Sequence, residues 1–533
     1  MPAPSILLDN LGFDWPSGAR ALAGLTAVFG PGRTGLIGAN GSGKSTLLRL
    51  IVGKLQPTRG TITTIGDVDY LPQNLTLRTT DRVVDLLGVR SRLEALRAIE
   101  AGRVDPELFD SVGDDWDIEA RARAVLDQIG LDGIGLDRPI GQLSGGETML
   151  AALAGHRLGG APIVLLDEPT NNLDREARGR FAEAVQEWRG ALVVVSHDTE
   201  LLEVMDDTAE LYAGELTVFG GPFSAYREHL MREQEAAEQA LRTAEQTLRA
   251  EERQRREAEV KLARRQRYAR TDYLNKRRPK IIMNTRKSQA ENSAGKLRDG
   301  LDARVDTARA DVEARERRVR NEAGVRIDLP DPRVPAGRRL AEVHHADGVE
   351  VIQGPERIAL TGRNGVGKTR LLETLFGAEV RGDAYAVGLT SRIGYLPQRL
   401  DGLVDAETVL ENVRAAAPRV VPGTIRGQLA RFGLRGAEVD RPVGSMSGGE
   451  RFRVAIARLL LADPAHQLLV LDEPTNNLDF DTRAALVDAL GSYRGGLLVV
   501  SHDPEFLGEI GIDVWLEMTE PDRLSPASPL SPG

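Results

Sequence analysis

Two glycine-rich loops contain the residues best suited to chemistry in this chain. Residues 38–46 read GANGSGKST and residues 362–370 read GRNGVGKTR, so both fit GxxxxGK followed by Ser or Thr. Glycines at these spacings let backbone N–H groups point at phosphate oxygens, and the following helix adds its positive end. The sequence therefore predicts two nucleotide sites built on Gly38, Asn40, Gly41, Gly43, Lys44, Ser45 and Thr46, and on Gly362, Asn364, Gly365, Gly367, Lys368 and Thr369.

Paired carboxylates end two apolar runs of strand length, at Asp167–Glu168 and at Asp472–Glu473. Buried charge is costly, so a pair of acids at this place favours function over a solvated strand end. We expect the aspartates to hold Mg²⁺, together with a loop hydroxyl and a nearby glutamine amide. The predicted metal set is Ser45, Gln73, Asp167, Thr369, Gln398 and Asp472.

The remaining catalytic candidates also occur in matching positions of the two halves. Glu168 and Glu473 are placed to polarise an attacking water as general bases. A single histidine is more often structural than catalytic, but SHD follows an apolar run twice. A role in sensing the terminal phosphate is therefore favoured, and the predicted catalytic set is Glu168, Glu473, His197, His502, Gln73 and Gln398.

An internal repeat places these motifs on common elements. The glycine loop, YLPQ, SGGE, LDEPTNNLD and VVSHD occur in one order, twice. Short apolar runs alternate with helical segments, which predicts mainly parallel sheets covered on both faces. The first copy has extra residues around 90–117, which we expect to be helical.

Together these blocks resemble the ABC ATPases, whose signature is the SGGE element. The resemblance implies ATP and Mg²⁺ as ligands, and two domains, each with a parallel sheet core and a helical subdomain. It also implies a head-to-tail arrangement in which each ATP lies between the glycine loop of one domain and the signature of the other. Ser447, Gly448 and Gly449 would thus complete the first site, and Ser144, Gly145 and Gly146 the second; Trp15 looks like the adenine-stacking aromatic of the first.

The signature helix departs from the family pattern in the first copy. Thr148 and Leu150 stand where the second copy has Arg451 and Arg453. This difference puts equal activity of the two sites in doubt.

EPTNNLD in both copies and the fusion of two domains look like the ABC-F class, and the match covers nearly the whole chain. That class implies a ribosome-acting ATPase in the cytoplasm, either a translation factor or a protector against antibiotics. It also implies contact with rRNA and the P-site tRNA near the peptidyl-transferase region, and a monomer whose two domains pair within the chain. The moderately long linker with an apolar tip favours a role in antibiotic resistance.

Other ABC classes fit less well. The motor subunit of a membrane transporter is the main alternative, but it offers no role for a basic insert between the domains. No apolar run reaches the roughly 18 residues of a membrane helix. The chain has no cysteine, which excludes thiolate zinc and iron–sulfur clusters and argues against the DNA-repair and ribosome-recycling classes.

The segment between the copies is basic although the chain is acidic. The 533 residues have a net charge of −10, whereas residues 227–322 hold 26 Lys and Arg against 18 Asp and Glu. Apolar positions spaced by three and four predict an antiparallel coiled-coil hairpin, with Leu297, Leu301, Val305, Val312 and Val319 on its second helix.

Residues 261–287, at the expected tip, hold 11 basic residues and one acid. A solvated helix would mix signs, so this bias favours RNA contact. The predicted RNA-contact set is Arg264, Arg265, Arg267, Tyr268, Tyr273, Lys276, Arg277, Arg278, Lys280, Arg286 and Lys287.

These observations predict an α/β chain of two tandem P-loop domains joined by a helical hairpin. The expected domains are residues 1–226 and 323–520, with the linker arm at 227–322. The Pro- and Ser-rich residues 521–533 are expected to be a disordered tail.

Overall fold

The computed structural model describes residues 3–528 except 74–80, 172, 275–279, 317–328, 381, 399–401 and 477; the side chains of residues 266, 268–270, 272–292 and 294 are also outside the description. The chain forms two compact units, one of residues 1–223 with 324–533 and one of residues 224–323. We call residues 1–223 the first half and 324–533 the second half.

Each half contains a six-stranded sheet with the same strand order. In the first half the order is β5 (Val68–Leu71), β6 (Ile163–Asp167), β7 (Ala191–Val195), β3 (Gly32–Ile37), β8 (Asp207–Tyr212) and β9 (Glu215–Gly220). In the second half it is β14 (Ile393–Leu396), β15 (Leu468–Asp472), β16 (Gly496–Val500), β12 (Arg357–Thr361), β17 (Val514–Glu520) and β18 (Arg523–Pro526). Only the last strand of each order pairs antiparallel, so the predicted parallel sheets are confirmed.

A three-stranded antiparallel sheet accompanies each large sheet. The first has the order β2 (Arg20–Phe29), β1 (Ser5–Asp14) and β4 (Arg59–Ile65). The second has the order β11 (Gly348–Gly354), β10 (Arg338–His345) and β13 (Tyr385–Gly388).

Helices separate the strands, as the alternating pattern predicts. The first half contains α1 (Lys44–Ile51), α2 (Val83–Leu86), α3 (Arg90–Glu100), α4 (Pro106–Val112), α5 (Ile118–Gln128), α6 (Gly145–Gly159), α7 (Arg175–Gln186) and α8 (Thr199–Glu203). The second contains α11 (Lys368–Thr374), α12 (Val409–Ala416), α13 (Pro422–Arg431), α14 (Gly448–Leu460), α15 (Phe480–Ser492) and α16 (Pro504–Glu509). Because α3 and α4 fall within residues 90–117, the predicted helical insertion is confirmed.

The apolar runs form the centres of the sheets. Every residue of β6, β7, β15 and β16 is buried. Strands covered on both faces are continuous runs of Val, Leu and Ile instead of alternating with polar residues. These strands therefore hold the residues that follow them, including the predicted acids and histidines, at one rigid edge of each sheet.

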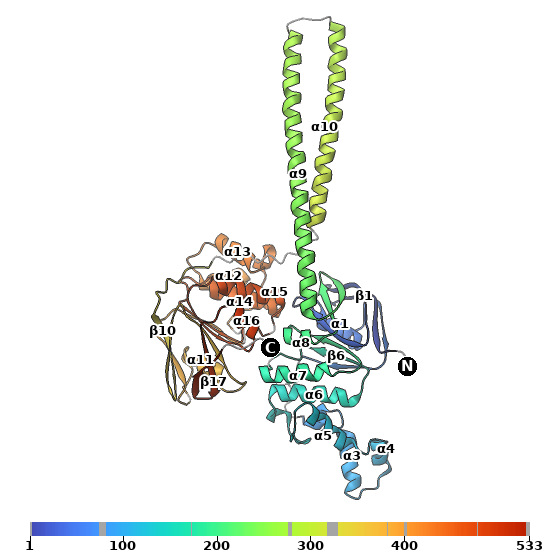
Figure 1. Ribbon diagram of the computed structural model, residues 1–533, viewed down its shortest axis with the longest axis vertical. Coiled ribbons are helices and arrows are strands. Elements are labelled where there is room, and N and C mark those ends of the chain that lie inside the picture. The colour runs from blue at the N-terminus through green and yellow to red at the C-terminus, as the bar shows by residue number, and fades with distance from the viewer. Residues whose placement is uncertain are drawn as a thin grey trace. The chain divides into compact units, whose positions relative to one another are not determined.

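The second unit is a helical hairpin of α9 (Phe223–Leu274, all but its first residue) and α10 (Lys280–Glu316), drawn in green and yellow-green in Figure 1. Ion pairs of Arg255 with Asp302 (2.7 Å) and of Arg309 with Glu252 (3.9 Å) show that the helices run antiparallel. Val305 is buried, as the coiled-coil spacing predicts, but Leu297 is 47% exposed, so the apolar stripe does not extend to that position. Val319 lies outside the described residues.

Two further expectations can be compared with the fold. The predicted disordered tail is wrong for residues 523–526, because β18 pairs with β17 and buries Leu524. Among the described helices, none combines the length and apolarity needed to cross a membrane.

Candidate nucleotide-binding sites

The first glycine-rich loop turns sharply between β3 and α1. Gly43 has φ = 106°, and a Cβ on Gly38 would lie 2.4 Å from the carbonyl oxygen of Leu211, so neither position accepts a side chain easily. The Lys44 ammonium donates to the carbonyl oxygens of Gly38 (2.6 Å) and Ala39 (3.1 Å). The loop thus curls around its own lysine, as do the glycine-rich loops that bind anions through backbone N–H groups.

A cavity of about 320 Å³ opens at this loop. Nine residues predicted for the nucleotide site line it, and Asn171, which was not predicted, is the tenth. The lining is Trp15, Asn40, Gly41, Gly43, Lys44, Ser45, Thr46, Gln73, Glu168 and Asn171. An aromatic ring, a phosphate-binding loop and a carboxylate therefore share one cavity, a combination suited to a nucleotide.

Asp167, at the end of β6, is held by two hydroxyl groups. Ser45 Oγ donates to Asp167 Oδ1 at 2.9 Å, and Tyr70 Oη donates to Asp167 Oδ2 at 3.0 Å. Burial and the charge of Asp167 raise the pKa of Tyr70 to about 12, so its phenol keeps its proton. A hydroxyl and a carboxylate side by side offer the hard oxygen ligands that Mg²⁺ prefers.

Glu168 follows at a strained position, with φ = 50°. Its Oε1 lies 3.4 Å from His197 Nε2, and the side chains of His197 and Glu168 are only 10% and 11% exposed. Burial raises the pKa of Glu168, while the nearby Lys44 opposes the shift. Burial also lowers the pKa of His197, so its imidazole is neutral beside the carboxyl group.

The second glycine-rich loop repeats this geometry between β12 and α11. Lys368 Nζ donates to the carbonyl oxygens of Gly362 and Arg363. It also lies 3.0 Å from His502 Nε2, which is 3.3 Å from Glu473 Oε1. Burial raises the pKa of Glu473 to about 7 and lowers that of His502 to about 3.

The aspartate of the second site has different surroundings. Tyr395, the counterpart of Tyr70, stacks on Phe376 with ring centres 4.6 Å apart. Its hydroxyl has no hydrogen-bond partner among the described residues. Burial raises the pKa of Asp472. Gln398 follows β14 and is exposed.

Both signature elements begin a helix with a reciprocal cap. Ser144 Oγ accepts from Glu147 N (3.1 Å) while Glu147 Oε2 accepts from Ser144 N (2.7 Å) at the start of α6. Ser447 and Glu450 make the same pair at the start of α14. The glycines that follow, Gly145, Gly146, Gly448 and Gly449, thus stand at helix N-termini, where backbone N–H groups attract anions.

Contacts within the first unit join the first loop to the second half. Asn40 N donates to Asp479 Oδ2 at 2.6 Å. A Cβ on Gly449 would lie 3.3 Å from the Asn40 Cβ, so the second signature lies against the first loop. Gly146, in contrast, packs against Ala177 of its own half.

The first signature helix has Leu150 where the second has Arg453, and an arginine from another helix takes the place of the missing one. In the second half, the Arg453 guanidinium would lie 3.0 Å from a Cβ on Gly433. The first half has Leu150 instead of that arginine, and Arg180 from α7 approaches the matching Gly130, donating to its carbonyl oxygen at 3.3 Å. A cation therefore covers this turn in both halves, although it comes from different helices.

The other substituted position makes different contacts in the two halves. Thr148 donates a hydrogen bond to the carbonyl oxygen of Ser144, whereas Arg451 forms an ion pair with Asp405.

Three residues near the first cavity were missed from the sequence: Tyr70, Asn171 and Asp479. All three belong to repeated blocks, YLPQ and LDEPTNNLD, and their repetition was an available signal.

Three of the predicted RNA-contact residues have described side chains. Arg264, Arg265 and Arg267 are exposed on α9. Lys276, Arg277 and Arg278 lie outside the described residues, as do the side chains of Tyr268, Tyr273, Lys280, Arg286 and Lys287.

Known proteins resemble this chain along nearly its full length. The ABC transporter family matches residues 28–171 and 350–476. The tylosin resistance ATP-binding protein TlrC of Streptomyces fradiae is 34% identical, over 90% of this chain and 92% of that protein. The energy-dependent translational throttle protein EttA of Mycobacterium tuberculosis is 29% identical, over 91% of this chain and 86% of that protein. The probable ATP-binding protein YheS of Escherichia coli is 30% identical, over 92% of this chain and 75% of that protein.

A solved structure shares the fold. The archaeal ribosome recycling factor aABCE1, in its complex with the ribosomal stalk protein aP1, superposes with a TM-score of 0.54 at 20% identity. The match covers 95% of this chain and 87% of that one. The matched family, the relatives and the duplicated ATP site agree: this chain belongs to the ABC transporter family of ATPases, in its ABC-F class, with two tandem nucleotide-binding domains.

Proposed function

We propose that this ATPase acts on the ribosome and that it protects translation against an antibiotic. The observation that supports the proposal most is the insertion of a hairpin with a basic end between two ATP-binding halves. Residues 261–287 hold 11 basic residues and one acid. Relatives named for tylosin resistance and for a translational throttle agree with a role in translation.

In the proposed mechanism, the glycine loops bind the phosphates of ATP. Lys44 exchanges the carbonyl oxygens of Gly38 and Ala39 for phosphate oxygens, and Lys368 does the same in the second site. Trp15, in the lining of the first cavity, stacks on the adenine.

Ser45 and Asp167 fit Mg²⁺ in the first site, and Thr369 and Asp472 occupy the matching positions of the second. The ion would supply charge that neutralises the phosphates. Gln73 and Gln398 provide a neutral amide near the same group.

Glu168 and Glu473 orient and polarise the water that attacks the terminal phosphate. Their burial keeps bulk water from competing for the carboxylate. His197 and His502, which are neutral, donate a hydrogen bond to the terminal phosphate and so distinguish ATP from ADP.

The signatures of the opposite halves complete the sites. Gly449 beside Asn40 supports this arrangement for the first site. Because each ATP binds to both halves, ATP binding favours closure of the halves, and hydrolysis allows them to open again. The hairpin, which connects the halves, would contact rRNA and the P-site tRNA through its basic tip.

The test uses a protein with both Glu168→Gln and Glu473→Gln. Binding remains possible and hydrolysis stops, so ATP is expected to trap the variant on 70S ribosomes in a sedimentation assay. The matched control adds Lys44→Ala and Lys368→Ala, which removes ATP binding. Sedimentation that is the same with and without ATP would contradict the proposal.

Growth tests then separate protection from a housekeeping role. Expression of the wild-type chain is expected to raise the tolerated concentration of a ribosome-targeting antibiotic, and the double Glu→Gln variant is not. An unchanged tolerance across the classes of such antibiotics would favour a translation factor.

A further inference from the structure

Three aromatic rings from distant parts of the chain form a continuous row at the first site. The ring centres of His197 and Phe480 lie 5.4 Å apart with planes at 70°, an edge-to-face contact. Those of Phe480 and Phe223 lie 4.6 Å apart with planes at 23°, a stacked contact. The row therefore runs from the site-one histidine through the second half to the first residue of α9.

Packing sets the orientation of His197. Neither of its ring nitrogens has a hydrogen-bond partner among the described residues, although only 10% of the side chain is exposed. Glu168 Oε1 lies 3.4 Å from Nε2 without making a hydrogen bond, so the ring is held mainly by the groups that pack against it. Phe480 is such a group, and it comes from the opposite half of the protein.

Phe480 is itself held in place. The preceding residue, Asp479, accepts a hydrogen bond from Asn40 N (2.6 Å) and another from Thr482 N (2.9 Å), which caps α15. Phe223 is only 4% exposed on the other side of the ring. A shift of Phe480 must therefore disturb both the first glycine loop and the start of α9.

Among the residues that the structure describes, no such row is found at the second site. Arg175 occupies the position of Phe480 in the repeat, directly after Asp174. His502 there lies 3.0 Å from Lys368 Nζ, so a polar contact helps to orient its ring. The two sites thus hold their histidines by different means.

We infer that Phe480 is a positioning residue for His197, and that the row His197–Phe480–Phe223 links ATP in the first site to helix α9. At the second site, the described residues form no aromatic row of this kind. The inference rests on the proposed role of His197 at the terminal phosphate. Because coupling is reciprocal in binding, a change at the start of α9 must also alter the first site.

The first experiment measures ATP turnover in a Glu473→Gln background, where single-turnover hydrolysis reports on the first site. Phe480→Ala and Phe223→Ala are each expected to lower the rate constant about three- to tenfold, the scale of one aromatic pair. The KM for ATP changes less, because the phosphate loop is untouched. The double variant is expected to be no slower than the slower single variant. Each single substitution already interrupts the same row, so the two effects do not add.

Matched variants separate this effect from misfolding. Phe480→Tyr keeps the ring and is expected to stay within about twofold of the parent, given the conserved stack. Arg175→Ala, read in a Glu168→Gln background, is the corresponding change at the second site and is expected to lower its turnover less than Phe480→Ala lowers that of the first site. A normal rate for Phe223→Ala, or additive losses in the double variant, would overturn the link.

The second experiment observes α9 directly. The chain has no native cysteine, and the Arg232 side chain is 72% exposed, so Arg232→Cys provides one site for a fluorophore. ATP is expected to change its emission in the parent and in Arg175→Ala, but not in Phe480→Ala. A full response in Phe480→Ala would overturn the inference. Turnover that persists in the double Glu168→Gln, Glu473→Gln variant would instead contradict the proposed catalytic assignment.

Discussion

The aspartates at the ends of β6 and β15 are equivalent in sequence but differ in how they are held. Tyr70 donates to Asp167, whereas the Tyr395 ring stacks on Phe376 and its hydroxyl has no partner among the described residues. A hydrogen bond to a carboxylate fixes the direction of its remaining lone pairs. Tyr70 therefore orients the proposed Mg²⁺ ligand in the first site only.

Removing the two phenol hydroxyls should affect the sites unequally. In a Glu473→Gln background, Tyr70→Phe is expected to raise the Mg²⁺ concentration needed for half-maximal turnover by about three- to tenfold, the net value of a typical hydrogen bond. Tyr395→Phe, measured in a Glu168→Gln background, should change the Mg²⁺ concentration for half-maximal turnover less than about twofold, because no hydrogen bond of the phenol is lost. A Mg²⁺ titration of single-turnover hydrolysis checks both, and equal shifts would contradict this role of Tyr70.

The sequence identified most of the cavity because phosphate chemistry repeats at fixed spacing. Lys44, Ser45 and Glu168 belong to motifs whose residue types are dictated by the ligand. Phe480 could not be found in this way. Its partner His197 is far away in the sequence and in the other half, and no spacing rule reports a contact made only by tertiary folding.

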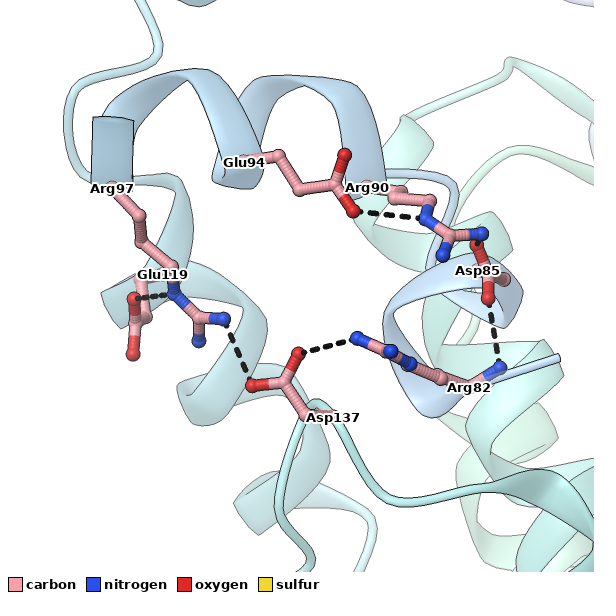
Figure 2. Close-up of polar contacts among 7 residues, drawn as sticks. All are labelled: Arg82, Asp85, Arg90, Glu94, Arg97, Glu119 and Asp137. Atoms are coloured by element: carbon pink, nitrogen blue, oxygen red, sulfur yellow. Dashed lines mark hydrogen bonds and ion pairs between the residues drawn. The ribbon is translucent and has the colours of Figure 1, made fainter. Parts of the chain in front are cut away.

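Among the elements, helix α3 of the insertion forms ion pairs with neighbouring parts of the first half, as Figure 2 shows. Asp137 lies between Arg82 (3.6 Å) and Arg97 (2.8 Å), and Arg97 also reaches Glu119 on α5 (3.3 Å). On the other side, Arg90 pairs with Asp85 and Glu94. The carboxylate of Asp137 thus joins the start of α2 to α3.

Neutralising this carboxylate should loosen the insertion slightly. Asp137→Asn is expected to lower the melting temperature by about 1–3 °C at low salt, because exposed ion pairs contribute little each. The difference should shrink in 0.5 M salt through screening. Asp132→Asn removes the same charge from an exposed position without a described ion pair and is the control. An equal loss in both variants would show that net charge, not the network, is responsible.

The sequence predicted that this insertion is helical but not how it is attached. Helical periodicity is local, whereas Arg97 and Asp137 are far apart in the sequence. The second half, built on the same repeat, instead pairs Arg426 with Asp440. The helices were therefore predictable from the sequence pattern, but the ion pairs that hold them against the rest of each half were not. The tail shows the converse error, because Pro and Ser content hid the short strand β18.

For the whole molecule, the distribution of charge is the main constraint on function. The chain has a net charge of −10, whereas residues 227–322 are net basic. Along α9, arginines pair with glutamates one turn earlier, as Arg242 does with Glu238 and Arg249 with Glu245. These pairs leave the flanks of the hairpin nearly balanced, so the unbalanced charge is concentrated in residues 261–287.

Reversing charge at the tip should therefore weaken ribosome binding more than reversing it on the flank. Arg277→Glu, Arg278→Glu and Lys280→Glu together remove three cations, and each phosphate contact that is lost reduces the salt dependence of binding by roughly one unit of slope. The flank control is Arg232→Glu, Arg242→Glu and Arg249→Glu, which changes net charge equally. Binding is measured by sedimentation at several salt concentrations in the Glu168→Gln, Glu473→Gln background. A smaller slope for the tip variant alone would place the phosphate contacts in residues 277–280. Equal slopes for both variants would mean that general attraction between the chain and RNA, and not the tip, determines binding.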